Sequence, residues 1–261
     1  MTAATNAWLN LLTEIADRAD PIALRYFRST GLAVDAKPDA SPVTVADRSI
    51  EEAARELIAR RHPGLGIFGE EFGETAAASG ARLIIDPIDG TRNFVRGIPI
   101  FASLLAIEER GDVIAGLVSA PAMGLRWHAV RGQGAFCGTR RLAVSPIPDL
   151  ARGQVFHGDL SGQAEKAPPP GIQALFRSAQ RTRGFGDFYQ HLLVAEGAGE
   201  VAIDPEVKPW DIAALQVIVE EAGGRATTVE GVRTIHGGSL ISSNTLVHER
   251  ALALLCGRPP V

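Results

Sequence analysis

The chain has 261 residues, 46% of them hydrophobic and 21% charged, so it can bury a substantial core in one large domain or two closely packed halves. A net charge of −4 gives no electrostatic reason to expect nucleic acid as the main partner, and two distant cysteines, Cys137 and Cys256, exclude a disulfide framework. The N-terminus lacks the basic start and apolar core of a signal peptide, and no stretch approaches the length of a membrane span. We therefore expect a cytoplasmic protein with no membrane partner.

Two amphipathic helices are expected near the N-terminus. In the first, over about residues 6–27, apolar side chains recur at steps of three and four residues. The second starts near Thr44 or Val45 and ends at the sequence "HPG", because proline and glycine do not continue a helix. A short strand and a glycine-bracketed turn follow in "LGIFGEEFG" at 65–73.

The middle of the chain is predicted to form strands. The apolar run Leu83, Ile84, Ile85 is typical of a buried strand, and we expect it to end where Asp86 begins. The runs at 98–109 and 112–121 predict an antiparallel hairpin, and "LRWHAVRGQGAFCG" at 125–138 predicts a second pair of strands.

A boundary is expected at "LSGQAEKAPPPG", residues 160–171, because this stretch is small, polar and ends in prolines. Beyond it, helical and strand patterns alternate. We predict an α+β half over 1–150 and an α/β half over 151–261, which together form one compact unit.

The sequence "DPIDG" places Asp86 and Asp89 on either side of Pro87 and Ile88. A tight turn would aim both carboxylates at one point, and such a cluster of oxygen atoms suits Mg²⁺ or Mn²⁺. The simpler alternative is an Asp-Gly turn with one capping aspartate. Two like charges at a strand end repel each other without a cation, which favours the metal site.

Three other acids are weaker candidates when each is taken alone. Glu70 in "GEE" could be a solvated surface residue, and Asp211 in "PWDIAAL" could cap a helix. Asp47 in "VTVADRSIE" could serve the dipole of the second helix. The histidines do not show a zinc-binding spacing, and neither a Walker A motif nor a nucleophile elbow is present.

Taken together, these motifs resemble the inositol monophosphatase family of Mg²⁺-dependent phosphatases. The resemblance rests on "GEE" at 69–71, "DPIDGTRNFVRGIP" at 86–99 and "WDIAAL…EEAGG" at 210–224. The stretches "KPDASPVTVAD", "TRGFGDFYQHLLVAEGA" and "PEVKPWD" are most similar to its histidinol-phosphate phosphatase branch. The resemblance implies a layered αβαβα sandwich of the inositol monophosphatase and fructose-bisphosphatase type, and a homodimer.

The resemblance also implies roles for individual residues. Two or three Mg²⁺ ions, for which Mn²⁺ could substitute, would be held by Glu70, Asp86, the Ile88 carbonyl, Asp89 and Asp211. The amides of Gly90 and Thr91 would bind phosphate, and Thr91, supported by Asp47 and Glu70, would orient the attacking water. Clustered metals would neutralise the phosphoryl oxygens and lower the pKa of that water.

The same resemblance places the leaving-group pocket near Asp187 and Asp204. Two acids there favour a cationic alcohol. Asp187 could instead cap a helix, and Asp204 stands where the family usually has the longer glutamate. The expected substrate is L-histidinol phosphate, ahead of myo-inositol phosphate and a nucleotide 3′-phosphate. A different class remains open, a binding protein without catalysis, although the intact set of site residues favours an enzyme.

Overall fold

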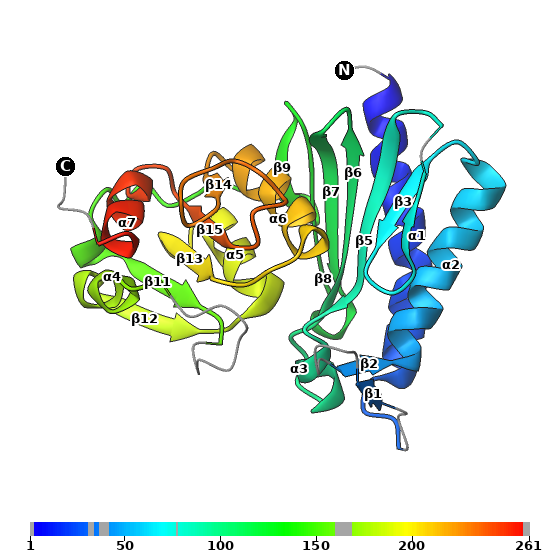
Figure 1. The fold of residues 1–261 in the computed structure, drawn as a ribbon, viewed down its shortest axis with the longest axis horizontal. Helices are drawn as coiled ribbons and strands as arrows, with labels where there is room; N and C mark the ends of the chain where they lie inside the picture. The colour runs from blue at the N-terminus through cyan, green and yellow to red at the C-terminus, as the bar shows by residue number, and fades with distance from the viewer. Residues whose placement is uncertain (1–2, 31–33, 37–41, 77, 160–168, 258–261) are drawn as a thin grey trace.

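The computed structural model describes residues 3–30, 34–36, 42–76, 78–159 and 169–257. Helices α1 (Ala3–Tyr26) and α2 (Val45–Arg61) lie side by side, as both were expected, and cover one face of a large sheet (Figure 1). Helix α2 begins where predicted because the Thr44 hydroxyl accepts a hydrogen bond from the amide of Ala46 at 3.1 Å. Most of the expected boundary at 160–171 lies outside the described residues.

The large sheet has eight strands in the order β10-β9-β8-β7-β6-β5-β3-β4. All neighbouring strands are antiparallel except β3 and β5, which run parallel. Its strands are β3 (Gly66–Gly69), β4 (Gly73–Thr75), β5 (Ala81–Asp89), β6 (Ala102–Glu109), β7 (Asp112–Ala120), β8 (Leu125–Val130), β9 (Gly134–Cys137) and β10 (Arg140–Arg141). A separate two-stranded sheet pairs β1 (Val34–Ala36) with β2 (Pro42–Thr44). The predicted antiparallel hairpin, β6 with β7, is confirmed, and so is the predicted second pair of strands, β8 with β9, which is also antiparallel.

The expected end of the central strand at Asp86 is wrong, because β5 continues to Asp89. Its pairing with β6 shifts register between Asp86 and Asp89, and Asp89 still lies opposite Ala102. A bulge of this kind accommodates Pro87, which has no amide hydrogen for the ladder. The hydroxyl of Ser103 donates instead to the Pro87 carbonyl at 2.6 Å. The irregularity therefore lies inside the strand, at Pro87 and Ile88, between two aspartates that both pair with β6.

The second sheet has five strands in the order β12-β11-β13-β15-β14. Strand β11 runs parallel to β12 and β13, whereas β15 is antiparallel to both β13 and β14. Its strands are β11 (Gln154–His157), β12 (Arg181–Gly184), β13 (Val201–Asp204), β14 (Arg225–Thr227) and β15 (Leu240–Ser243). The remaining helices are α3 (Thr91–Val95), α4 (Ile172–Ser178), α5 (Asp187–Ala195), α6 (Pro209–Glu221) and α7 (His248–Leu255), with short 3₁₀ turns at Pro121–Met123 and Leu150–Arg152.

The layers follow one another as helices, large sheet, helices, small sheet and helices (Figure 1). On β5, Leu83 and Ile85 pack against α1 and α2, whereas the alternate residue Ile84 faces α6. Val194 of α5 packs on the small sheet, and α4 and α7 cover the opposite face of that sheet. The expected αβαβα sandwich is confirmed. In the described part of the chain, no helix has both the length and the apolar character needed to cross a bilayer.

Candidate functional site

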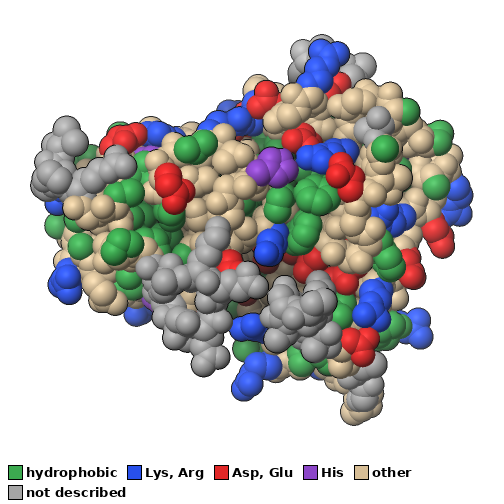
Figure 2. All heavy atoms as spheres, viewed as in Figure 1, with side chains coloured by type: hydrophobic (Ala, Val, Ile, Leu, Met, Phe, Trp, Pro, Cys, Tyr) green, Lys and Arg blue, Asp and Glu red, His purple; other side chains and the backbone are tan. Residues whose placement is uncertain are grey.

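Three carboxylates converge between the two sheets. Oxygen atoms of Asp86, Asp89 and Asp211 all lie within 4.8 Å of one another. The first two come from β5, and Asp211 is the third residue of α6, where it also accepts a hydrogen bond from the Lys208 amide at 2.7 Å. Acidic side chains gather around a hollow near the middle of the face drawn in Figure 2. Because Asp211 accepts the Lys208 amide and also belongs to the cluster, it can cap the helix and take part in the site.

The electrostatics of this cluster call for a cation. Burial raises the pKa of Asp86 well above its ordinary range, and the charges of Glu70, Asp89 and Asp211 raise it further. Burial is also the main reason that the pKa of Asp211 rises to about 7. In addition, Oδ1 of Asp86 is buried without a hydrogen-bond partner among the described residues. Carboxylate oxygens are the ligands that a divalent ion such as Mg²⁺ prefers. A buried oxygen that lacks a hydrogen bond is free to bind one.

Glu70 lies on the loop after β3, beside the cluster but outside the group of oxygens that lie within 4.8 Å of one another. Its amide donates to the Ile85 carbonyl at 3.2 Å, and its carboxylate lies close enough to act on Asp86. Glu51 of α2 holds this loop in place. Its carboxylate is fully buried and accepts hydrogen bonds from the amides of Glu71 at 2.8 Å and Phe72 at 3.2 Å. Sequence reasoning missed Glu51, although its spacing of four residues from Asp47 places both acids on one face of α2.

Thr91 lies beside the cluster at the start of α3. Its hydroxyl donates to the Ile88 carbonyl at 2.9 Å and lies 3.4 Å from Oδ1 of Asp47. Asp47 is itself buried, and its Oδ2 accepts hydrogen bonds from the Thr44 amide at 2.9 Å and the Thr44 hydroxyl at 2.6 Å. Its predicted helix-terminal position is therefore correct, and its other oxygen still faces Thr91.

Gly90 precedes α3 with a φ of 80°, a left-handed conformation that favours glycine. A Cβ at this position would come within 2.9 Å of the Ile100 carbonyl and 3.3 Å of Oδ2 of Asp187. The absent side chain therefore lets Asp187 lie directly against the loop of the "DPIDG" motif.

Asp187 does not cap α5. Gly186 occupies the N-cap position, and Oδ2 of Asp187 instead accepts a hydrogen bond from Nδ2 of Asn93 at 2.9 Å. Its φ of 52° is unusual for a residue with a side chain, and such strain is often found at functional sites. The next amide, that of Phe188, donates to Oδ2 of Asp89 at 2.7 Å. The turn before α5 thus places Asp187 next to the three converging acids.

Asp204, at the end of β13, lies close enough to act on Asp187 and Asp89. Its charge raises the pKa of both Asp187 and Asp89, although burial is the larger cause for each. Oδ2 accepts a hydrogen bond from Gln190 at 2.5 Å and lies 3.1 Å from Nε2 of His191. The sequence did not identify Asn93, Gln190 or His191 as site residues, because amides and a lone histidine are common on helices.

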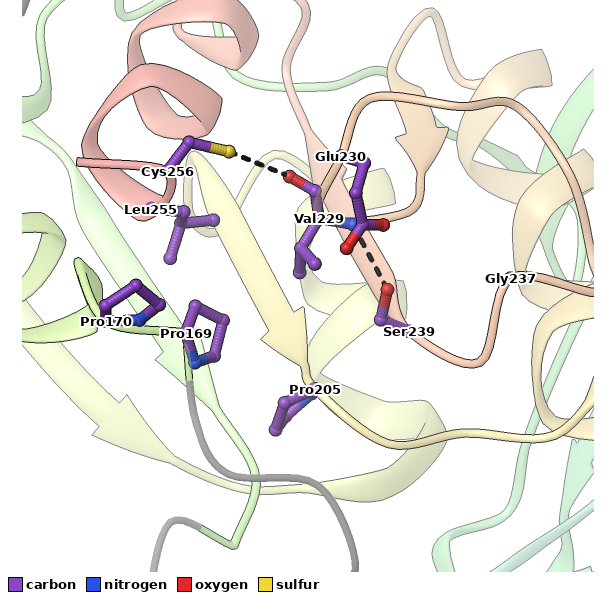
Figure 3. A pocket seen from close by; sticks show the side chains of 9 residues that line it. All are labelled: Pro169, Pro170, Pro205, Val229, Glu230, Gly237, Ser239, Leu255 and Cys256. Atoms are coloured by element: carbon purple, nitrogen blue, oxygen red, sulfur yellow. Dashed lines mark hydrogen bonds between the residues drawn. The ribbon is translucent and has the colours of Figure 1, made fainter. Parts of the chain in front are cut away.

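A second pocket, of about 250 Å³, lies in the small-sheet half (Figure 3). Pro169, Pro205 and Cys256 line it, and a hydrogen bond of 3.1 Å joins the Val229 amide to the Ser239 hydroxyl in its wall. None of the predicted site residues contributes to this pocket. The converging acids, not this cavity, are therefore the candidate reaction site.

Comparison with known proteins gives one family along the whole chain. The model of the inositol monophosphatase family matches residues 5–258. The histidinol-phosphatase of Mycobacterium tuberculosis is 45% identical over 252 residues, which cover 95% of this chain and 97% of the relative. The inositol-1-monophosphatase of Rhizobium meliloti is 32% identical, with 98% of both chains covered. Among solved structures, the extragenic suppressor protein SuhB from Bartonella henselae matches with a TM-score of 0.87 and 30% identity, over 95% of this chain and 98% of that one.

Proposed function

The chain belongs to the inositol monophosphatase family and is a phosphatase, and from this premise we propose that it hydrolyses L-histidinol phosphate to L-histidinol and phosphate. The observation that carries the proposal is the 45% identity with a histidinol-phosphatase over 95% of the chain. The two carboxylates of Asp187 and Asp204 beside the converging acids support it, because this substrate carries an ammonium group and an imidazole.

Mg²⁺ would be held by Glu70, Asp86, Asp89, Asp211 and the Ile88 carbonyl, in two or three sites that Mn²⁺ could also occupy. The mutual approach of Asp86, Asp89 and Asp211 to within 4.8 Å supports this assignment, as does Oδ1 of Asp86, which has no hydrogen-bond partner among the described residues. When bound, divalent ions would neutralise charge on the phosphoryl group and lower the pKa of the attacking water. The carbonyl of Ile88 already accepts the Thr91 hydroxyl and has a second lone pair for an ion.

The chain itself would orient both reactants. The Thr91 hydroxyl donates its single hydrogen to the Ile88 carbonyl. Its oxygen can therefore accept a hydrogen bond from water. Asp47, next to Thr91, and Glu70, whose charge acts on Asp47, would fix the direction of that water for in-line attack. The amides of Gly90 and Thr91 would hold phosphate oxygens, since the glycine allows the close approach of an anion. The leaving alkoxide would take its proton from solvent water.

The test is phosphate release from purified protein with Mg²⁺, on L-histidinol phosphate, myo-inositol 1-phosphate and adenosine 3′,5′-bisphosphate, each with and without EDTA. We expect kcat/KM for histidinol phosphate to be at least about a hundredfold higher than for the others, and to be abolished by EDTA. A preference for myo-inositol 1-phosphate would move the assignment to the activity of the Rhizobium meliloti relative. No release from any ester would favour a binding role over catalysis.

A further inference from the structure

The acidic centre contains more carboxylates than the converging set. Asp187 and Asp204 act on Asp89 through their charges, yet their oxygens do not join the group that lies within 4.8 Å. Resting on the proposed function, we propose that Asn93 and His191 are positioning residues. Their hydrogen bonds keep Asp187 and Asp204 out of the metal cluster and present them to the two cationic groups of the substrate.

Asn93 anchors the first of these carboxylates. Its Nδ2 donates to the Ile100 carbonyl at 3.0 Å and to Oδ2 of Asp187 at 2.9 Å, so both amide hydrogens are used. The two residues of this second hydrogen bond are 94 positions apart in the sequence, so the bond joins the "DPIDGTRNF" motif to the start of α5. Oδ1 of Asp187 makes no hydrogen bond to any described residue, which leaves it as the acceptor for a ligand.

His191 and its neighbour Gln190 anchor the second carboxylate through the same oxygen, Oδ2 of Asp204. The ring of His191 is buried, with Nδ1 at 2.9 Å from the Ser242 hydroxyl. The ring therefore lies between a hydroxyl and a carboxylate, with Nε2 placed to donate to Oδ2 of Asp204. The other oxygen, Oδ1, lies against Gly158, where a Cβ would come within 2.2 Å of it. The glycine leaves room for that oxygen.

The shared pattern is one anchored oxygen and one oxygen without a hydrogen bond to the described residues. A loose carboxylate beside a cluster of divalent ions would rotate to join it, because oxygen ligands bind such ions strongly. Hydrogen-bond donors on one oxygen oppose that rotation and leave the other oxygen for the substrate. Two fixed carboxylates then bind a leaving group that has two separated cationic or donor groups. They bind a neutral polyol less strongly.

The experiment compares His191→Leu with a matched control, His248→Leu. Both histidines are buried and hydrogen-bonded to hydroxyl groups, His248 to Thr227 at 3.0 Å and Ser243 at 2.7 Å, but only His191 touches Asp204. For each variant, kcat and KM are measured for L-histidinol phosphate and myo-inositol 1-phosphate, with an inhibition constant replacing KM if an ester is not turned over. Asn93→Ala tests the other anchor and covers the case in which His191→Leu does not fold.

We expect His191→Leu and Asn93→Ala to raise KM for histidinol phosphate about tenfold, with kcat and the KM for inositol phosphate changed by less than about threefold. His248→Leu should lower Tm comparably and leave the ratio of the two KM values unchanged. If wild-type protein prefers histidinol phosphate and the anchor variants keep that preference, the positioning role is overturned. If wild-type protein shows no such preference, the proposed function fails, and this inference fails with it.

Discussion

At the scale of single residues, Asp89 connects the acidic cluster to the small-sheet half. Its Oδ2 accepts the Phe188 amide at 2.7 Å, and its carboxylate is one of the three that converge. Asp89→Asn retains an oxygen that can accept the Phe188 bond but removes a charged metal ligand. We expect phosphate release to fall roughly a hundredfold or more, while the protein remains folded.

Thermal unfolding and calorimetric titration with Mg²⁺ check this expectation, because the variant should bind the ion more weakly and unfold at a similar temperature. Asp112→Asn is the control, since Asp112 is exposed and its carboxylate forms an ion pair with Arg233 at 3.1 Å, away from the cluster. A folded Asp89→Asn protein with near-normal turnover would rule out the proposed metal ligands.

Asp187 is expected to act on substrate affinity more than on chemistry. Asp187→Asn preserves the size of the side chain but removes the charge that would attract an ammonium or imidazolium group. KM should rise about tenfold for L-histidinol phosphate and less for myo-inositol 1-phosphate. Asp149→Asn, in a residue whose carboxylate caps a 3₁₀ turn through the Ala151 amide, should change neither. Equal increases for both esters would remove Asp187 from specificity.

The sequence identified the acidic residues of this site but not the neutral residues that hold them. Asp86, Asp89 and Asp211 are conspicuous because a charge that follows an apolar run, or opens an amphipathic helix, departs from the local pattern. Asn93 lies in the five-residue helix α3 and His191 in α5, and neither residue departs from its local sequence pattern. Their importance depends on partners that the fold brings together, and no local pattern contains that information.

At the scale of elements, α2 holds the loop that carries Glu70. Glu51 accepts two loop amides, and its partner Arg55 donates to the Gly73 carbonyl at 2.5 Å. Glu51→Gln replaces one of the two acceptor oxygens with an NH₂ group, which cannot accept a hydrogen bond, so one loop N–H loses its partner. We expect the Mg²⁺ concentration for half-maximal activity to rise about tenfold, with activity largely restored at saturating Mg²⁺.

Hydrogen exchange on the metal-free protein provides a second measurement for Glu51→Gln, because the amides of Glu71 and Phe72 should exchange faster. Glu200→Gln is the matched control: Glu200 is also buried and accepts a backbone amide, that of Gln154, but in the small sheet. If the Mg²⁺ dependence of activity is unchanged in Glu51→Gln, the hydrogen bonds between Glu51 and the loop do not position Glu70.

The contact between β7 and α6 depends on Gly116. A Cβ there would lie 2.6 Å from Cγ1 of Val217 and 3.0 Å from the Ala214 carbonyl. Gly116→Ala should therefore destabilise the protein by about 1–3 kcal/mol, because the helix must move away from the sheet. Urea unfolding measures this, with Gly64→Ala as control, since the nearest atom to its Cβ would be 3.9 Å away. Equal stability of the two variants would contradict the tight packing.

The long elements could be predicted because each carries its own periodic pattern. Both N-terminal helices and the hairpin of β6 and β7 follow this rule. The full length of β5 could not be predicted, because proline and two aspartates are unfavourable in a strand and only pairing with β6 extends it to Asp89. The helix α3 has five residues, too few for any periodicity to show.

At the scale of the whole molecule, the acidic centre exists only when the layers are packed. Asp86 and Asp89 come from the large sheet, Asp211 from the helix layer between the sheets, and Asp204 from the small sheet. Folding therefore brings like charges together in a buried site, which costs free energy of folding. Bound cations would offset that cost. The sequence indicated the acids, but their convergence depends on how the two sheets pack against the same helices.

This arrangement predicts how stability depends on pH and metal. In the metal-free protein, burial raises the pKa of Asp211 to about 7, against an ordinary value of 3.8. Between these values the folded state binds the proton more tightly than the unfolded chain, so this contribution to stability is complete at low pH and is lost as pH rises through about 7. We expect Tm in EDTA to fall from about pH 5 to about pH 8.

Mg²⁺ should reverse that loss, because a cation replaces the protons that the cluster releases. The rise in Tm on adding Mg²⁺ should therefore be larger at about pH 8 than at about pH 5. Asp211→Asn should weaken the pH dependence in EDTA and reduce the response to Mg²⁺, since the amide neither titrates nor provides a charged ligand, whereas Asp86 and Asp89 still titrate. A metal-free Tm that rises steadily through neutral pH, with an equal Mg²⁺ response at both values, would contradict a buried acidic cluster whose charge the metal compensates.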